Sequence, residues 1–555
     1  MQIDPHTPAL SGPGEPFEIC EQVVNGRTMR VFARAVGSLS SLYATMPGRG
    51  DMDFIVDGDR RITYAQFHAL TGAAAAGLAA EFGVTHGQRV AIAMHNTPEW
   101  MVAFTASSAL GAIPALINSR GSGDEMRYCI EDVGASLVIA DARRADALVQ
   151  ARYEGKILVL DEATLDAMAR DYASSPLPES KMETDDPSCI LFTSGTTGRP
   201  KAAIITNRAM LTGIMMTQHA GARFAARMAE KLGVDMATLM AARQRTAAFL
   251  VMPLFHIGGC QAVFLTVMAN GGKIVFHRRW NPAEAVRLIE KEQITQFTGP
   301  PMTLWDLLAE PSRHEHDLSS LGSIACGGQS FTPSLLAAMQ EAFPGRVFGG
   351  GYGMTETAGS ISLAMGELYT SRPECSGVAH DVVEVRVIDE DGAVLALGEV
   401  GEICIRGPMI MSGYWGRPEE TAAAVDAQGW LKTGDIGSID ETGYVAIVDR
   451  KTNMVISKGE NIYCAEVERA IAGHPDIADV AAFGVPDARI GERLVVAVTP
   501  HPGREVTEET VRQQVRSKLA DYKMPAEVFL RHEPIHRNAT GKVDRQVLRQ
   551  ELGLI

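Results

Sequence analysis

The chain has 555 residues, 46% of them hydrophobic and 21% charged, which is ordinary for a globular protein and excludes wholesale disorder. Its formal net charge of −16 disfavours binding to nucleic acid or to an anionic lipid surface, because either partner would be repelled. The apolar runs are too short to cross a bilayer and no secretory signal begins the chain, so we expect no transmembrane segment and a cytoplasmic location. Eight scattered cysteines form no Cys-x-x-Cys pair, which predicts reduced thiols rather than disulfides or a zinc site.

Helical and strand patterns alternate through the first half of the chain. A capping box at Thr63–Gln66 begins an alanine-rich helix that reaches Ala80, and Thr97-Pro98 begins a second helix with Gly111 beyond its end. Such alternation predicts a layered α/β fold. Short apolar runs predict buried strands at 90–94, 112–117, 137–140, 157–160, 188–192, 202–205 and 248–252.

The pattern changes in the second half. Residues 220–247 predict an added helical stretch that covers the core, with an acyl-pocket wall or a partner surface as alternatives. From Val382, short strands and Gly-rich turns predict a β-rich part, with hairpin turns at Asp391-Gly392 and at 441–443.

A charged, polar stretch around 449–454 precedes a compact tail. We therefore predict two domains, 1–449 and 450–555. The tail is predicted to contain helices at 465–472, 507–522 and 545–552 and strands at 479–485 and 493–499.

The densest polar signal is Thr-Ser-Gly-Thr-Thr-Gly-Arg-Pro-Lys at 193–201, between two predicted strands. Hydroxyl groups and the backbone N–H groups of a glycine-rich loop can surround phosphate oxygens, and a lysine adds a charge-assisted contact. The spacing is not that of a Walker A loop, and a flexible surface loop is the alternative. The run predicts a polyphosphate-binding loop made of Thr193, Ser194, Gly195, Thr196, Thr197, Gly198 and Lys201.

A second signal, Gly-Tyr-Gly-Met-Thr-Glu at 351–356, combines nucleotide-handling groups in what we expect to be one short loop. Tyr352 can stack on a base, Thr355 can donate to a phosphate, and Glu356 can hold a hard cation such as Mg²⁺. Glycines let a planar base approach the backbone. The predicted nucleotide-binding residues here are Gly351, Tyr352, Gly353, Met354 and Thr355, together with Gly328, which follows a predicted strand at 323–326.

Three further side chains are candidates. Asp435 ends a strand-like run and can accept both hydrogen bonds of a ribose diol, with a turn aspartate as the alternative. Arg450 can add a sugar or phosphate contact, although a surface ion pair is the alternative. Lys542 lies in a small-residue turn at 537–542, just before a predicted helix.

Taken in this order, the segments at 193–201, 351–356, 430–435, 449–463 and 537–542 resemble those of the AMP-forming acyl-adenylating superfamily. Acyl-CoA synthetases, adenylation domains of peptide synthetases and beetle luciferases belong to it, and the resemblance covers nearly the whole chain. It implies an α/β fold in which a large N-terminal domain contains two α/β subdomains plus a β-rich subdomain. A small mobile α+β C-terminal domain then carries the catalytic lysine.

The resemblance also implies roles for these residues. The 193–201 loop grips the β- and γ-phosphates of ATP, Tyr352 stacks on adenine, and Glu356 supports Mg²⁺. Asp435 and Arg450 hold the ribose. Lys542 bridges the substrate carboxylate and the α-phosphate, where cations must offset the repulsion between two anions.

Two more segments follow from the resemblance. Pro253–Gly259 lies beside the acyl pocket, where His256 flanks the carboxylate, with a structural histidine at a strand end as the alternative. Ser457, Lys458 and Gly459 face the tunnel for the thiol arm of coenzyme A. The C-terminal domain is expected to rotate between the two half-reactions, but the pivot departs from the family pattern, with Thr452 and Asn453 in place of the usual charged residues.

The leading hypothesis is an ATP- and Mg²⁺-dependent carboxylic acid:CoA ligase that acts on a medium- or long-chain fatty acid. An aromatic or alicyclic acid:CoA ligase is an alternative. Two others are a stand-alone adenylating enzyme for a carrier protein or another acceptor, and an inactive ligand-binding relative. The expected partner is a small-molecule carboxylic acid, and the oligomeric state stays open, with a homodimer among the alternatives.

Overall fold

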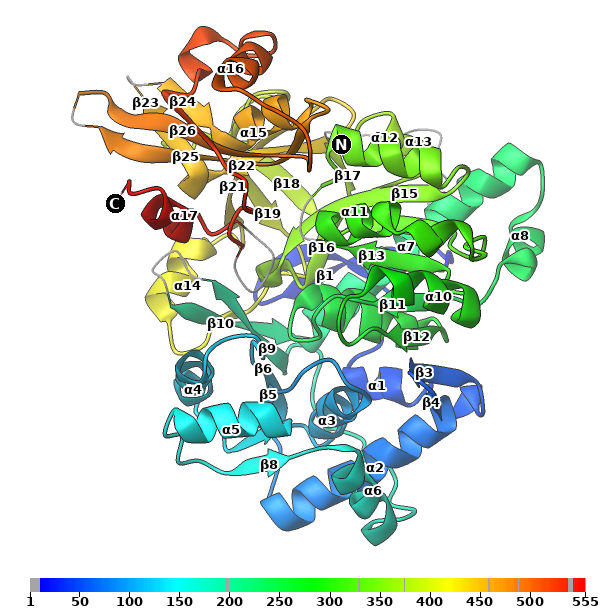
Figure 1. Ribbon diagram of the computed structural model, residues 1–555. Helices are drawn as coiled ribbons and strands as arrows, with labels where there is room; N and C mark the ends of the chain where they lie inside the picture. The colour runs from blue at the N-terminus through cyan, green and yellow to red at the C-terminus, as the bar shows by residue number, and fades with distance from the viewer. Residues whose placement is uncertain are drawn as a thin grey trace.

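The computed structural model describes residues 10–194, 199–327, 330–373, 375–457, 460–487, 489–537 and 543–554. Within them the chain forms two large sheets, a five-stranded sheet near the C-terminus and a two-stranded ribbon (Figure 1). In Figure 1 the C-terminal part, coloured orange to red, lies above the larger body. The ribbon consists of β1 (Ile19–Val24) and β2 (Arg27–Phe32), and the short helix α1 (Leu39–Tyr43) follows it.

The first large sheet has seven strands, and five of them run parallel. Alternate residues of a strand point to opposite faces, so Val90 and Ile92 join one hydrophobic core while Ala91 and Ala93 join another. Burial on both faces explains the continuous apolar runs of the sequence. Across the sheet the strands are β20 (Gly413–Tyr414), β10 (Pro200–Thr206), β9 (Pro187–Ser194), β6 (Ile113–Leu116), β5 (Arg89–Ala93), β7 (Leu137–Ala140) and β8 (Ile157–Val159).

Helix α3 (Pro98–Ala109) lies between the two large sheets. All of its residues are buried, and the core that it joins contains side chains from both sheets. Trp100 stacks on Phe104 with ring centroids 5.6 Å apart. The helix begins at the predicted Thr97-Pro98 signal, which is confirmed. The other helices of this part are α2 (Tyr64–Phe82), α4 (Gly123–Asp132), α5 (Ala142–Gln150) and α6 (Glu162–Asp171).

The second large sheet has thirteen strands and joins a parallel half to an antiparallel half. The β-rich part predicted from Val382 belongs to the antiparallel half, but that half begins earlier in the chain, with β16 and β17. The pairing of β15 with β16 joins it to the parallel half. In order the strands are β18 (Glu384–Ile388), β19 (Gly401–Arg406), β21 (Leu431–Ile439), β22 (Tyr444–Arg450), β17 (Cys375–Ala379), β16 (Gly359–Met365), β15 (Val347–Met354), β14 (Ser323–Cys326), β13 (Gln296–Gly299), β11 (Ala247–Leu250), β12 (Lys273–Phe276), β3 (Asp53–Asp57) and β4 (Arg60–Thr63).

The helical stretch predicted at 220–247 is two helices, and it begins earlier. Helix α7 (Asn207–Leu232) is capped by Thr206 and ends at Gly233, which adopts the left-handed conformation that favours glycine. Its residues up to Ala229 contribute to the core, as predicted, whereas α8 (Met236–Ala242) has no buried residue. The remaining helices of the large body are α9 (Thr266–Ala269), α10 (Pro282–Glu292), α11 (Pro301–Ala309), α12 (Pro333–Ala342), α13 (Glu367–Thr370) and α14 (Pro418–Ala424).

The C-terminal sheet is built entirely from residues after the end of β22. The division at 449/450 stays a prediction. The helix predicted at 507–522 ends at Arg516, because the chain then turns to pair β27 with β26. The elements are β23 (Met454–Ser457), β24 (Glu460–Tyr463), β25 (Ile477–Asp487), β26 (Gly491–Pro500), β27 (Glu527–Leu530), α15 (Cys464–Ala472), α16 (Glu508–Arg516) and α17 (Arg545–Glu551).

The chain between β19 and α14 crosses from the thirteen-stranded sheet to the seven-stranded sheet. The amide of Met411 donates to the carbonyl of Glu356 at 2.8 Å, and the amide of Trp415 donates to the carbonyl of Ala202 at 2.8 Å. Strand β20, which lies on this path, pairs with β10. One short segment therefore holds residues of both sheets together beside the predicted phosphate loop.

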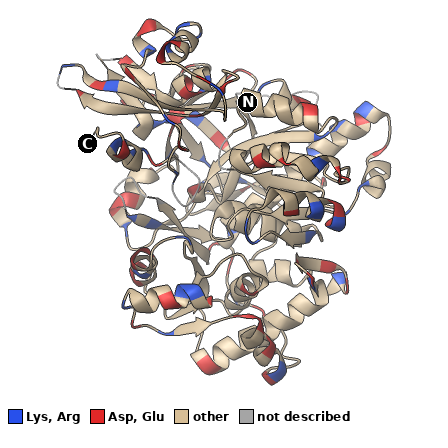
Figure 2. Cartoon of the chain, in the orientation of Figure 1, with Lys and Arg blue, Asp and Glu red and all other residues tan. Residues whose placement is uncertain are grey.

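In the view of Figure 2, the positions of Lys and Arg and those of Asp and Glu are interspersed along the described chain. This fits the net charge of −16 and gives no support to nucleic-acid binding. Within the described residues, no disulfide bond joins any of the eight cysteines. Among the described residues, no helix is both long enough and apolar enough to span a membrane.

Candidate active site

Tyr352, Asp435 and Arg450 form one cluster on neighbouring parts of the large sheet. The Tyr352 hydroxyl donates to Asp435 Oδ2 at 2.6 Å, and Arg450 Nε lies 3.2 Å from Asp435 Oδ1. Asp435 pairs with Arg450 in the register of β21 and β22. Burial and the charge of Asp435 raise the pKa of Tyr352 well above its usual range, so the phenol remains a donor. The structure brings together three residues that the sequence predicted separately.

The backbone around this cluster differs from the prediction. Asp435 lies in the middle of β21 rather than at a strand end, and Gly351 to Met354 belong to β15 rather than to a loop. A Cβ atom at Gly353 would lie 2.1 Å from the carbonyl oxygen of Gly359, and one at Gly351 would lie 2.7 Å from that of Ser362. The neighbouring strand therefore requires these glycines, whether or not a base approaches them.

Glu356 follows directly in a short 3-10 turn with Thr355, and only 6% of it is exposed. Its Oε1 atom accepts a hydrogen bond from the Tyr414 hydroxyl at 2.9 Å. Two residues later Ala358 adopts a left-handed backbone (φ +48°), which is uncommon outside glycine. Backbone strain of this kind collects at functional sites.

Lys201 is the cation of the 193–201 run that the sequence assigns to phosphate, and it lies within the described residues. It pairs with Thr193 in the β9–β10 hairpin, so the loop connects two strands as predicted. Its ammonium lies 5.3 Å from the centre of the Tyr414 ring and 2.6 Å from Glu420 Oε2. Lys201 and Glu356 therefore both contact Tyr414.

Tyr414 and Glu420 are functional candidates that the sequence reasoning missed. Neither stands in a motif that carries chemistry by itself, and the Tyr414–Glu356 contact joins residues 58 positions apart. The only local signal is the short apolar and glycine run before Arg417-Pro418, where a helix begins. The hydrogen bond from Lys201 lowers the pKa of Glu420.

His256 is half-buried and lies just before a π-helix at Gly258–Leu265. Its carbonyl accepts the amides of Gly259 at 3.0 Å and Cys260 at 2.9 Å, so the residue begins that helix. π-Helices are rare and concentrate at functional sites. The side chain of Met252 lies between Gly258 and Gly327, at 3.3 to 3.4 Å from the Cβ positions that those glycines lack. Met252 therefore packs against Gly258, two residues after His256.

Asp449, of which only 5% is exposed, bonds to the segment in which the sequence predicts a hinge. Its Oδ1 atom accepts from the Arg450 amide at 2.6 Å and from Asn453 Nδ2 at 3.3 Å. Its Oδ2 atom accepts from the amide of Ala465 at 2.7 Å, in the first turn of α15. An ionised aspartate at position 453 could not donate to Asp449. This hydrogen bond therefore explains why asparagine suits position 453.

Of the remaining predicted residues, one lies within the described residues and the others lie outside them. Ser457 is described and ends β23 beside Gly491. Gly195, Thr196, Thr197, Gly198, Gly328, Lys458, Gly459 and Lys542 lie outside the described residues, as does the side chain of Ser194.

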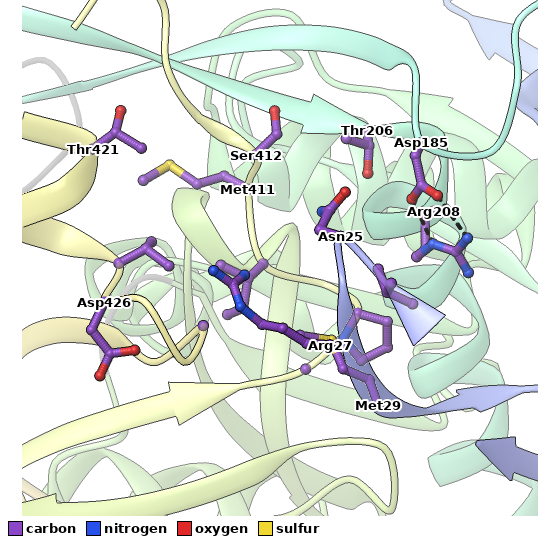
Figure 3. Close-up of a pocket in the computed structure, with 16 residues that line it drawn as sticks. Asn25, Arg27, Met29, Asp185, Thr206, Arg208, Met411, Ser412, Thr421 and Asp426 are labelled. Atoms are coloured by element: carbon purple, nitrogen blue, oxygen red, sulfur yellow. Dashed lines mark hydrogen bonds and ion pairs between the residues drawn. The ribbon is translucent and has the colours of Figure 1, made fainter. Parts of the chain in front are cut away.

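A cavity of about 170 Å³ lies behind the crossing segment, between the β1–β2 ribbon and α14 (Figure 3). Met411 and Ser412 line one side, and the ion pair of Arg208 with Asp185 lines another. None of the described residues with a predicted catalytic, nucleotide or metal role lines it. The cavity is therefore separate from the candidate active site.

The residues present fit a nucleotide with its magnesium ion. Buried Asp435 offers carboxylate oxygens, which can accept from a sugar diol, beside an aromatic ring. Among the described residues no group of three or more His, Cys, Asp or Glu side chains is arranged to hold a metal. A single carboxylate such as Glu356 suits Mg²⁺, which is commonly bound by one or two carboxylates plus substrate phosphates.

Comparison with known families gives a match over most of the chain. Residues 43–415 match the model of the AMP-binding enzymes, and residues 466–542 match the model of the AMP-binding enzyme C-terminal domain. The chain belongs to the AMP-binding enzyme family. This confirms both the resemblance found in the sequence and the predicted fold class.

Named relatives of this AMP-binding enzyme cover nearly its whole length. It is 34% identical to 3-[(3aS,4S,7aS)-7a-methyl-1,5-dioxo-octahydro-1H-inden-4-yl]propanoyl:CoA ligase of Mycobacterium tuberculosis, over 93% of this chain and 98% of the relative. It is 32% identical to the long-chain-fatty-acid–CoA ligase FadD13 of the same species, over 89% and 93% of the two chains. Among solved structures, O-succinylbenzoate coenzyme A synthetase (MenE) of Bacillus subtilis, in complex with ATP and a magnesium ion, superposes with a TM-score of 0.77 at 27% identity. That superposition covers 93% of this chain and 99% of the other.

Proposed function

We propose that this AMP-binding enzyme converts a hydrophobic carboxylic acid, ATP and coenzyme A into an acyl-CoA thioester, AMP and pyrophosphate. The chain is an AMP-forming acyl-CoA synthetase, and its acid is, in this proposal, a medium- or long-chain fatty acid. The observation that carries the proposal is that Lys201 and Glu356 both contact one side chain, Tyr414. Tyr352 and Asp435 form a second cluster, and Tyr352 belongs to the same 351–356 segment as Glu356.

The first half-reaction joins the acid to AMP. A carboxylate oxygen attacks the α-phosphorus, the bond to the pyrophosphate oxygen breaks, and pyrophosphate leaves. Lys201 and the 193–201 loop would hold the β- and γ-phosphates, and Asp435 and Arg450 would hold the ribose. Lys542 would stabilise the charge that develops as two anions approach.

Glu356 is the residue that would hold Mg²⁺. When bound, the ion neutralises phosphate charge that side chains alone leave unbalanced. The hydrogen bond from Tyr414 orients the Glu356 carboxylate at Oε1.

The second half-reaction transfers the acyl group to sulfur. The thiol of coenzyme A attacks the acyl carbon, the bond to the AMP oxygen breaks, and the thiol proton is released. Ser457, Lys458 and Gly459 would line the path of the thiol arm, and His256 would flank the reacting carboxylate. Because Lys542 and residues 457–459 belong to the same C-terminal part, we propose that this part rotates between the steps.

A ring-bearing acid is the second candidate substrate. It is favoured by the bicyclic propanoate ligase, which matches this chain at 34% identity over 98% of its own length. FadD13, named for long-chain fatty acids, favours the first candidate at 32% identity. A cytoplasmic location and a homodimer stay predictions.

The test is acid-dependent pyrophosphate release over short-, medium- and long-chain fatty acids and aromatic and alicyclic acids, each with and without coenzyme A. We expect release with thioester formation for one hydrophobic class, and loss of both in Lys542→Ala. Release without any thioester would instead identify an adenylating enzyme for a carrier protein or another acceptor. No release with any acid would support an inactive ligand-binding relative.

A further inference from the structure

Glu420 stands beside the lysine that the proposed function assigns to the triphosphate. Its Oε2 atom lies 2.6 Å from Lys201 Nζ, and the two side chains are 37% and 20% exposed. The contact joins β10, the strand that follows the predicted phosphate loop, to helix α14. This pair is partly shielded from water, so it is stronger than an ordinary surface ion pair.

The first turn of α14 is anchored, so Glu420 does not sit on a loose helix end. Arg417 donates to Asp132 at 2.6 Å and to the Tyr128 hydroxyl at 3.0 Å, both on α4. Thr421 Oγ1 accepts from the Tyr414 amide at 2.9 Å and donates to the Arg417 carbonyl at 2.8 Å. These bonds fix the backbone on either side of Glu420.

The lysine side chain is fixed from a second direction by Tyr414. The ring centre lies 5.3 Å from the Lys201 ammonium, and the hydroxyl of the same ring donates to Glu356. Lys201 lies on β10, and the pairing of Ala203 of that strand with Tyr414 holds Lys201 and Tyr414 near each other. The ammonium is therefore held between a carboxylate and an aromatic face.

We propose that Glu420 is a positioning residue for ATP binding: it holds the Lys201 ammonium over Tyr414 so that its other N–H donors serve the triphosphate. A lysine ammonium has three donors, so an ion pair with one carboxylate oxygen of Glu420 leaves donors for phosphate oxygens. A free lysine side chain loses rotamer freedom when it is immobilised, and Glu420 removes part of that cost before ATP binds. The proposal rests on the proposed function, because that function gives Lys201 its phosphate.

An opposite role is conceivable from the same contact, in which Glu420 competes with phosphate for Lys201. The two roles differ in sign. Positioning predicts weaker ATP binding when the carboxylate is removed, whereas competition predicts tighter binding.

The experiment compares Glu420→Ala, Glu420→Gln and the matched control Glu419→Ala, which changes the exposed neighbouring glutamate on the same turn. We measure the KM for ATP, the KM for the acid and kcat, and the Kd of ATP with Mg²⁺ by calorimetry. We expect Glu420→Ala to raise the KM and Kd for ATP about three- to tenfold, with kcat and the KM for the acid little changed. Glu420→Gln retains an acceptor and is expected to recover most of the loss, and Glu419→Ala should match the wild type.

A double-variant cycle separates positioning from a general structural role. In a Lys201→Ala background, Glu420→Ala should cause no further loss of ATP affinity, because its partner is gone. Tighter ATP binding in Glu420→Ala, an equal loss in Glu419→Ala, or fully additive losses in the double variant would each overturn the proposal. Calorimetry reports on ATP binding even if no acid in the panel is turned over, so failure of the proposed function is distinguishable from failure of this inference.

Discussion

Asp435 and Asp449 lie on paired strands of the large sheet, and both are almost fully buried, yet they bond to different kinds of partner. Asp435 bonds to the side chains of Tyr352 and Arg450, which the sheet itself holds in place. Asp449 bonds to backbone amides of the hinge and of α15, which belong to the C-terminal part. Under the proposed function, Asp435 therefore serves a binding site held by the sheet, while Asp449 serves the junction between the large body and the C-terminal part.

The largest effect is expected from a change in the C-terminal part, to which Asp449 is bonded. Lys542→Ala should lower the rate of adenylate formation about 100- to 1000-fold, because a preorganised cation is lost from a step in which two anions meet. The measurement is single-turnover pyrophosphate release. Conversion of a supplied acyl-adenylate to thioester should change far less, and an equal loss in both steps would contradict a role confined to the first.

In the binding site held by the sheet, Asp435→Ala should raise the KM for ATP about 10- to 100-fold, since hydrogen bonds to a charged group are worth about 1.5–3 kcal/mol. Steady-state kinetics with ATP varied would measure it. Glu441→Ala, at the exposed turn between β21 and β22, is the matched control. A KM for ATP that does not move in Asp435→Ala would remove this residue from the nucleotide site.

Asp449→Ala tests the junction directly. It removes the acceptor for three donors, so the hinge at 450–453 should open more often, and trypsin should cleave after Arg450 or Lys451 about three- to tenfold faster. Gel analysis of a cleavage time course gives the rate. Cleavage as slow as in the wild type would show that Asp449 does not hold the hinge closed.

A separate effect concerns the stability of the large body. Burial, with the nearby charges of His219 and Arg223, lowers the pKa of His380 from 6.5 to about 3. The unfolded chain therefore binds a proton below pH 6.5 that the folded chain binds only near pH 3, so the free energy of unfolding falls as the pH falls through that window. One such group contributes a slope of about 1.4 kcal/mol per pH unit.

Urea unfolding at several pH values would measure that slope, with His380→Gln as the comparison. Between pH 6.5 and about 3, the unfolding free energy of the variant should depend less steeply on pH, by the slope that one proton contributes. Equal slopes in the two proteins would mean that His380 does not stay neutral in the folded state.

Local signals of the sequence predicted the fold well where the cause was local. The capping box at Thr63 is present, and the strands from 89 to 206 and the flanks of the 193–201 loop stand where apolar runs placed them. The nucleotide candidates Tyr352, Asp435 and Arg450 could be named because each side chain suits its chemistry and the motifs resemble a family.

What the sequence could not predict depended on contacts between distant residues. Asp435 continues a strand because β19 and β22 pair on both sides of it, and the helix after Thr507 stops early because β27 must reach β26. Tyr414 and Glu420 gain their importance only when strand β20 pairs with β10. No pattern within a short window reports such a pairing.

The segment that crosses between the two large sheets has a mechanical consequence. Its amides bond to Glu356 of one sheet region and to Ile204 and Ala202 of the other, and Tyr414 at its end contacts both Lys201 and Glu356. Separating the two large sheets would break all of these bonds at once. The proposed phosphate-binding side of the site is therefore held to both sheets as one body. The rotation proposed for the chain beyond Arg450 would leave these bonds intact. In the proposed mechanism, access to the reaction centre therefore depends on the C-terminal part, and the large body is the surface against which that part would close.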